Sequence, residues 1–172
     1  MCLAGYNFIS NYIHCVKEIF KQFTTMKTIL LAVDFPDNIT PLFDKTLALA
    51  QAFNSKVWIL HVAPPEPDFV GYDPGPQEVR DGVAKDLRKD HVSVQKLGQL
   101  FKDQGVETEA LLVQGSTAET IVNEAEKLNA DLLVFGSHQS SFFRKLLLGD
   151  TAKDIIRKAN IPMLVIPLGP DE

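Results

Sequence analysis

Runs of apolar residues and segments with helical spacing follow one another along the chain, which predicts alternating strands and helices. The first, second and fourth runs are almost continuously apolar, as in strands covered on both faces. The third run is mixed in polarity and is expected nearer an edge, while the last run is apolar and flanked by prolines. The five expected strands are Thr28–Val33, Lys56–Val62, Val106–Gln114, Ala130–Phe135 and Pro162–Pro167.

Apolar residues at spacings of three and four predict a helix between each pair of strands. Thr40 is expected as the N-cap of the first helix, with Pro41 in its first turn. The second helix is long and polar, with an expected break near His91 and Gly105 as its C-cap residue. The predicted helices are Pro41–Phe53, Gln77–Gln104, Thr117–Leu128 and Asp150–Ala159, and the predicted long loops are Ala63–Pro76 and Gly136–Gly149.

Strands that are mostly linked by helices predict an α/β fold with a doubly wound, five-stranded parallel sheet and helices on both faces. Ligands of such sheets bind beyond the carboxyl ends of the strands, where the winding reverses. The candidate ligand contacts are therefore residues at strand ends. They are Asp34, with Ala32 two residues before it, Val62, Gly115 and Gly136.

The first 25 residues form a segment of their own, followed by one predicted domain over residues 26–172. A helical apolar stripe runs along this segment through Phe8, Ile9, Tyr12, Ile13, Val16, Ile19, Phe20 and Phe23. A signal peptide is disfavoured, because no basic region comes first and charged residues interrupt the stripe. A membrane-surface or partner-binding helix is an alternative. We favour a helical or disordered extension outside the fold, with Met26 as the authentic start.

Length, charge and cysteine content argue against several classes of protein. The 172 residues suit one globular domain, and 17 basic against 22 acidic residues give a net charge of −5. This balance argues against a dedicated nucleic-acid binder, which needs clustered positive charge. The only cysteines, Cys2 and Cys15, suggest no disulfide framework, and no apolar run reaches the roughly 18 residues of a membrane span. We therefore expect a soluble cytoplasmic protein, with membrane association disfavoured.

The usual signatures of catalysis and metal binding are missing from the sequence. It has neither a Walker-type phosphate loop nor Gly-x-Gly-x-x-Gly, and Cys-x-x-Cys, His-Glu-x-x-His and Gly-x-Ser-x-Gly are absent too. The four histidines lack ligand-like spacing, so no metal site is predicted. Ser137 and His138 are sequence neighbours, which seldom face each other as nucleophile and base. The sequence therefore predicts no catalytic residue and no enzyme activity.

The stretch from Gly136 to Thr151 contains residues that could bind a ligand. A glycine at a strand end lets the backbone approach a ligand, and Gly149-Asp150-Thr151 opens a helix whose free N–H groups favour an anion. Arg144 and Lys145 between them could face phosphate. Each feature also has a purely structural interpretation: Asp34 as a turn former or helix cap, Gly136 as a tight turn, and Gly149-Asp150 as an ordinary helix start.

Several segments together resemble the universal stress protein A family, over nearly the whole chain after residue 25. They are Ile29–Asp34, Leu60-His61-Val62, Gln114-Gly115-Ser116, Ala130–His138 and Ile161–Pro167. The resemblance implies an adenine nucleotide alpha hydrolase-like fold and a stress-response protein that acts on unknown protein clients. It also implies a homodimer joined through Pro162–Pro167 as an edge strand. In such proteins the backbone at Val62 would lie beside an adenine.

One branch of this family binds ATP through the pattern Gly-x2-Gly-x9-Gly-Ser/Thr, and another branch lacks the pattern. Gly136 and Gly149 match it at the right separation, whereas Gln139 and Asp150 replace its second glycine and final hydroxyl. His138, just before Gln139, is a further candidate ligand contact. A carboxylate about 4 Å from a phosphate charge costs roughly 4 kcal/mol at an effective dielectric of about 20. We therefore expect weak or absent ATP binding. The alternative is an ATP- or AMP-binding switch, or a slow ATPase, that uses Asp34, Gly136, Gly149 and Thr151.

Overall fold

The computed structural model describes residues 26–35, 39–65, 76–138 and 150–168. Within these residues, five strands form one all-parallel sheet in the order β3-β2-β1-β4-β5. The strands are β1 (Thr28–Val33), β2 (Lys56–Ala63), β3 (Thr108–Gln114), β4 (Leu132–His138) and β5 (Met163–Leu168). The helices are α2 (Thr40–Phe53), α3 (Gln77–Asp103), α4 (Thr117–Lys127) and α5 (Asp150–Lys158). The predicted doubly wound sheet is confirmed.

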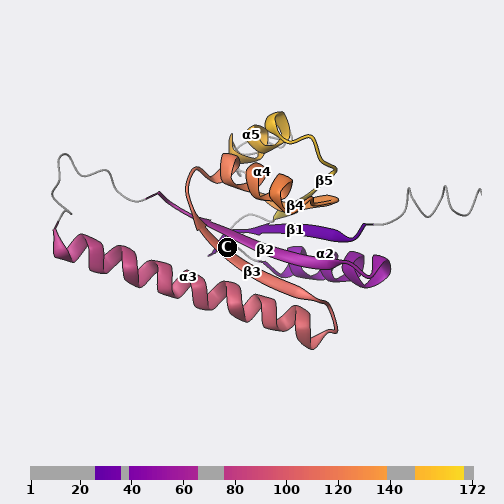
Figure 1. Cartoon of the computed structure of the whole chain (residues 1–172), viewed down its shortest axis with the longest axis horizontal. Helices are drawn as coiled ribbons and strands as arrows, with labels where there is room; N and C mark the ends of the chain where they lie inside the picture. Colours follow the sequence, from indigo (N-terminus) through magenta and orange to yellow (C-terminus); the bar gives the residue numbers. More distant parts are fainter. Residues whose placement is uncertain (1–25, 36–38, 66–75, 139–149, 169–172) are drawn as a thin grey trace, which may run out of the picture.

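The helices form a layer on each side of the sheet. The chain winds from β1 through β2 to β3, then returns to the other side of β1 with β4 and β5. Because crossovers between parallel strands are right-handed, this reversal sends α2 and α3 to one face and α4 and α5 to the other, as Figure 1 shows. The winding therefore changes direction between β1 and β4, where a ligand crevice is expected.

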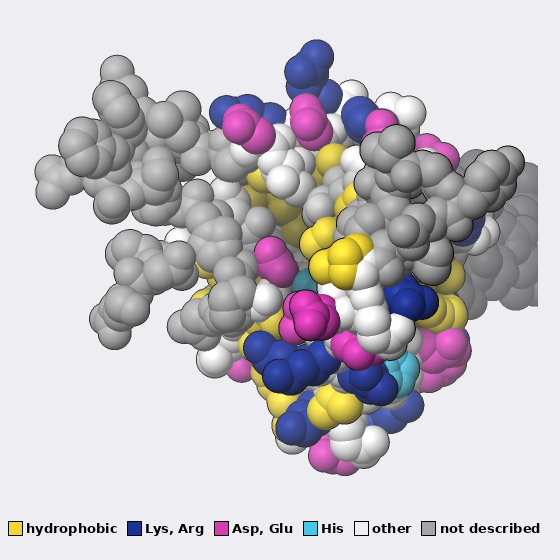
Figure 2. All heavy atoms as spheres, turned by 90° about the vertical axis from the view of Figure 1, so that its left-hand side faces the viewer, with side chains coloured by type: hydrophobic (Ala, Val, Ile, Leu, Met, Phe, Trp, Pro, Cys, Tyr) yellow, Lys and Arg dark blue, Asp and Glu magenta, His cyan; other side chains and the backbone are white. Residues whose placement is uncertain are grey.

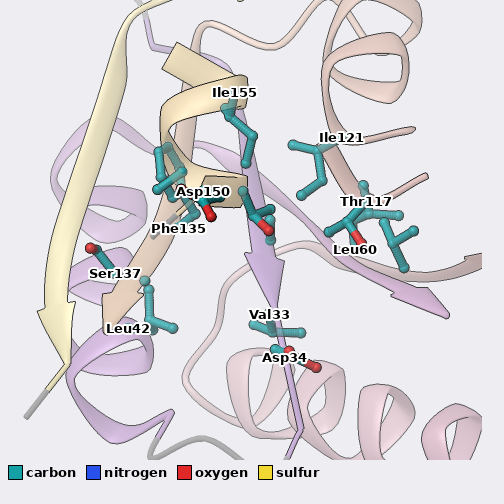
Figure 3. A pocket seen from close by; sticks show the side chains of 15 residues that line it. Val33, Asp34, Leu42, Leu60, Thr117, Ile121, Phe135, Ser137, Asp150 and Ile155 are labelled. Carbon is teal, nitrogen blue, oxygen red and sulfur yellow. The ribbon is translucent and has the colours of Figure 1, made fainter. Parts of the chain in front are cut away.

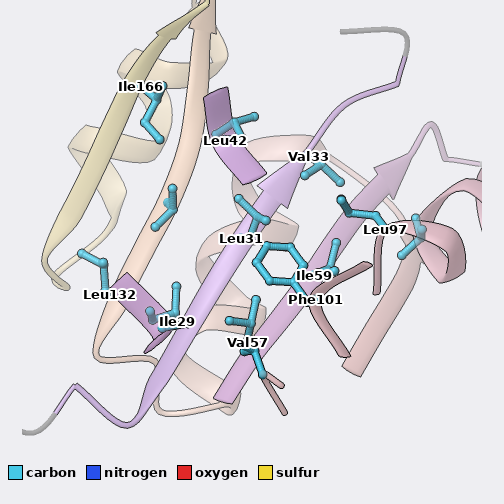
Figure 4. Packing of buried hydrophobic residues seen from close by; sticks show 14 of the residues in the cluster. Ile29, Leu31, Val33, Leu42, Val57, Ile59, Leu97, Phe101, Leu132 and Ile166 are labelled. Carbon is cyan, nitrogen blue, oxygen red and sulfur yellow. The ribbon is translucent and has the colours of Figure 1, made fainter. Parts of the chain in front are cut away.

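Alternate residues of the central strands supply two separate cores. Ile29, Leu31 and Val33 of β1 pack toward α2 and α3, while Leu30 and Ala32 pack toward α4 and α5. Figure 4 shows the first of these cores, in which Phe101 of α3 is fully buried among the strands. Its ring lies 4.7 Å from that of Phe43 in α2, in a tilted contact. Because both faces of β1 are covered, all of its residues after Thr28 are apolar.

Two helix predictions differ from the structure. No break occurs near His91, because the apolar stripe of α3 continues across it from half-buried Leu87 to buried Val94, two turns later. Thr40 is the first residue of α2 rather than its N-cap, which is Ile39. Proline in the first helical turn needs no N–H partner, so the helix can begin one residue earlier than predicted. Gly105 does follow α3 in the left-handed region, with φ of 78°.

Hydrogen bonds hold the first described residues at the amino ends of the strands. The Oδ2 atom of Asp131 accepts hydrogen bonds from the backbone N–H groups of Lys27 at 2.7 Å and Thr28 at 2.9 Å. The Ser55 hydroxyl donates to the carbonyl of Met26 at 2.5 Å. The predicted extension over residues 1–25 lies outside the described residues and stays a prediction. None of the described helices combines the length and the apolar character that crossing a membrane requires.

Candidate functional site

A cavity of about 260 Å³ lies at the reversal between β1 and β4, beneath the first turns of α4 and α5. Its walls are mainly apolar and come from both faces of the sheet (Figure 3). Polar groups gather at its rim. The apolar wall residues include Val33, Leu42, Leu60, Ile121, Phe135 and Ile155, and the polar rim consists of Asp34, Thr117, Ser137, Asp150 and Thr151. An apolar slot with a few convergent polar groups is typical of small-molecule sites.

Six of the ten predicted ligand contacts line this cavity. They are Ala32, Asp34, Val62, Gly136, Asp150 and Thr151. Gly115 lines a neighbouring hollow that shares Asp34 and Val62 with the cavity. His138 is the last residue of β4. Gln139 and Gly149, with Arg144 and Lys145, lie outside the described residues.

Gly136 does not begin a loop, as the sequence predicted. The strand β4 begins later than expected and extends through His138, because its pairing with β5 continues through Ser137↔Pro167 and His138↔Leu168. A Cβ atom on Gly136 would lie 2.5 Å from Cδ1 of Leu168 and 3.4 Å from Cδ1 of Leu42. Close packing of two leucine side chains is therefore a sufficient reason for glycine at this position.

Asp150 places a negative charge at the rim of the cavity. It is the first residue of α5, where the sequence predicted the helix to begin. Its side chain is 98% exposed, and Oδ1 accepts a hydrogen bond from Nζ of Lys153 at 3.0 Å. The start of a helix attracts anions. Here that position already carries a carboxylate, which opposes binding of a second anion.

Asp34 is the second acidic group of the rim. It follows the last residue of β1, and its side chain is 75% exposed. The N-cap of α2 is Ile39, so Asp34 does not cap that helix. Seen from the carboxyl ends of the strands (Figure 2), acidic side chains lie near the middle of this face, with basic side chains gathered below them. Two carboxylates at one small cavity make it a poor site for a highly charged anion.

Sequence reasoning missed several rim and wall residues. Thr117 begins α4 directly after the Gln114-Gly115-Ser116 segment, so its place at a strand-to-helix turn was a usable signal. Ser137 is buried within β4 and reaches the rim only because the strand is longer than predicted. The apolar walls come from six elements far apart in the sequence, which no local pattern could bring together.

Other charged clusters lie away from the cavity. A hydrogen bond from Lys56 to Glu109 is the main cause that raises the pKa of this lysine. Desolvation lowers the pKa by less than this, and a hydrogen bond to Glu107 raises it further. Lys56 also lies 4.5 Å from the centre of the Trp58 ring. It is the first residue of β2, at the opposite end of the sheet from the cavity. Among the described residues, no cluster of three histidine, cysteine or carboxylate side chains could hold a metal ion.

Comparison with known sequences shows which protein family this chain is similar to. The sequence model of the Universal stress protein family matches residues 25–167. Universal stress protein A of Escherichia coli K12 is 30% identical over 149 residues, which cover 85% of this chain and 97% of that protein. The protein called universal stress protein in QAH/OAS sulfhydrylase 3′region, from Thermus aquaticus, is 31% identical and covers 81% of this chain and 98% of its own length.

Solved structures share the fold. Universal stress protein UspA from Lactobacillus plantarum superposes with a TM-score of 0.69 at 18% identity, over 83% of this chain and 98% of that one. A universal stress protein from Archaeoglobus fulgidus in complex with dAMP gives 0.56 at 22% identity, over 81% and 97% of the two chains. A universal stress protein in complex with cAMP gives 0.58 at 22% identity, over 83% and 98%. These likenesses show the fold, which is adenine nucleotide alpha hydrolase-like, as predicted.

Proposed function

The chain belongs to the universal stress protein family, and we propose that it is a non-enzymatic stress-response or signalling protein with weak or absent affinity for ATP. The family membership covers almost the entire described chain, from residue 25 to residue 167. Among the described residues, the rim of its cavity carries hydroxyls and carboxylates, and no histidine lines the cavity. Binding, rather than catalysis, is the property that this site supports.

The negative charge of Asp150 at the start of α5 is the observation that carries the proposal. A triphosphate would bring several further negative charges to a rim that Asp150 and Asp34 already make acidic. Lys153 neutralises Asp150 only in part, because the carboxylate remains 98% exposed. The cavity of about 260 Å³ is also smaller than the roughly 300 to 1,000 Å³ of typical small-molecule sites.

We expect the purified protein to carry no ATP and to bind added ATP-Mg²⁺ no better than millimolar, which corresponds to about −4.1 kcal/mol. Isothermal titration calorimetry on the full chain, together with nucleotide analysis of the unfolded sample, measures both. Adenosine titrated under the same conditions is the control, because it fills the same apolar slot without phosphate charge. A micromolar dissociation constant for ATP contradicts the proposal.

The second candidate is a nucleotide-dependent switch that binds a less charged nucleotide such as AMP. It is supported by the apolar walls of the cavity and by the threonines that begin α4 and follow Asp150 in α5. Two structural neighbours were solved with dAMP and cAMP. The same titrations separate the candidates: AMP binding at least tenfold tighter than ATP binding, at micromolar concentration, favours the switch.

We also propose that the protein is a homodimer joined through β5. This strand is at the edge of the sheet, where β4 pairs with it on one side only. Its half-buried apolar residues Met163, Leu164 and Val165 lie between two exposed prolines. An apolar edge strand is a natural surface for association with a second copy.

Sedimentation velocity of the full chain should give twice the mass of one chain. Val165→Lys, which places a charge on the half-buried part of β5, should shift the population to monomer. Gln114→Lys is the matched control, because it adds the same charge at the exposed end of β3 on the opposite edge. A wild-type protein that stays monomeric at micromolar concentration excludes this dimer.

A further inference from the structure

His61 is a buried titratable residue that the proposed function does not use. It lies near the carboxyl end of β2 with 5% of its surface exposed, and its ring makes a tilted contact with Phe35 at 5.3 Å. Its two ring nitrogens face different elements. Nδ1 lies 3.0 Å from the carbonyl oxygen of Val33 at the end of β1, and Nε2 lies 3.5 Å from Oδ2 of Asp90 in α3.

The partners of His61 determine where its protons belong. A backbone carbonyl only accepts hydrogen bonds, so Nδ1 must carry a proton toward Val33. An ionised carboxylate also only accepts, so the Nε2 atom needs a second proton to bond to Asp90. Both contacts are satisfied together only by the imidazolium form. The neutral ring would direct the Nε2 lone pair at a carboxylate that is itself only 22% exposed.

The charges around the ring favour the same form. The described residues that line the hollow beside His61 come from the ends of β1 and β2, from α3 and from the turn into α4. Apart from His61, the titratable side chains among them are Asp90 and Asp34, whose Oδ1 lies 3.9 Å from Nδ1. Both are acidic, so each stabilises a positive charge on the ring.

Asp90 lies where α3 leaves the sheet. The buried residues of α3, which are Val94, Leu97, Gly98 and Phe101, all follow Asp90 in the sequence. The part of the helix before Asp90 runs beyond the sheet (Figure 1), and its first six residues are exposed. The contact with His61 therefore joins α3 to the end of β2 one turn before Val94, the first fully buried residue of the helix.

We propose that protonated His61 is a latch that joins α3 to the carboxyl ends of β1 and β2 and opens when the ring loses its second proton. Val33 and Asp34 line the cavity described above, so the latch also positions one side of its rim. His61 is a positioning residue, since it acts through the carbonyl of Val33.

Asp90→Asn tests the latch, because its effect on Tm should differ between two pH values. At pH 5.5, with the ring protonated, the variant should lower Tm by about 2 to 4 °C, because it removes the charge that pairs with the ring. Near pH 8 the neutral ring can accept a hydrogen bond from the new amide, so Tm should be unchanged or higher. Differential scanning calorimetry of the full chain measures both values.

Asp86→Asn is the matched control, because Asp86 lies one turn earlier on α3 and is exposed. It should give the same small Tm change at both pH values. An equal effect of Asp90→Asn at both pH values overturns the latch. The ¹⁵N NMR spectrum of the wild-type ring gives an independent test: a neutral ring at low pH, or a proton on Nε2 instead of Nδ1 at high pH, also overturns it.

Discussion

Replacing Gln139 by glycine and Asp150 by serine together should strengthen ATP binding by at least tenfold. The double variant restores the glycine and the hydroxyl of the nucleotide-binding pattern and removes the carboxylate at the start of α5. At about 4 Å, repulsion between two unit charges is worth about 1 kcal/mol in water and about 4 kcal/mol at an effective dielectric of 20. These limits correspond to about fivefold and a thousandfold in affinity.

The 98% exposure of Asp150 places its repulsion toward the lower limit, because water screens an exposed charge. The remaining gain should come from the new serine hydroxyl and the restored glycine. Calorimetric titration with ATP-Mg²⁺ measures the change. Asp154→Ser is the matched control, since it removes one negative charge from an exposed position of the same helix that does not line the cavity.

If Asp154→Ser strengthens ATP binding as much as the double variant does, the cause is net charge rather than the local rim. If the double variant binds no better than wild type, the explanation of weak binding by Asp150 is wrong. A gain confined to the double variant supports both the position of the site and the reason for its weakness.

The fold could be predicted because short sequence patterns identify its strands and helices. Continuous apolar runs such as Thr28–Val33 identify strands buried on both faces, and the helical spacing between them implies crossovers. Chain direction and right-handed crossovers then leave few arrangements. The ends of the strands were harder to predict, because the end of β4 depends on its pairing with β5, which no local pattern records.

The site could be predicted only in part, because some of its contacts depend on strand pairing and helix packing that no local pattern records. Strand ends indicated Asp34, Val62 and Gly136, all of which line the cavity. The contact of His61 with Asp90 joins two elements whose relative position depends on how α3 packs, so no sequence pattern indicates it. The missing Cβ of Gly136 also makes room for Leu168, 32 residues later in the chain, which no local pattern indicates.

Gly136→Ala should destabilise the protein by about 1 to 3 kcal/mol, the usual cost of forcing an extra methyl group into a packed core. The new Cβ would lie 2.5 Å from Cδ1 and 3.0 Å from Cγ of Leu168, a side chain that is only 3% exposed. Leu168 cannot move outward without opening a gap in the core it shares with Leu42. Urea unfolding of the variant measures the change in free energy.

A double-mutant cycle with Leu168→Val separates packing from a role in ligand approach. Valine lacks the Cδ1 atom that the new methyl group would meet, so Gly136→Ala should cost at least about 1 kcal/mol less in this background. Gly82→Ala is the control, because Gly82 lies in exposed helix with no atom near its missing Cβ. It should stabilise by about 0.5 to 1 kcal/mol, since alanine favours helix. Equal costs of Gly136→Ala in both backgrounds would mean that Leu168 is not the reason for this glycine.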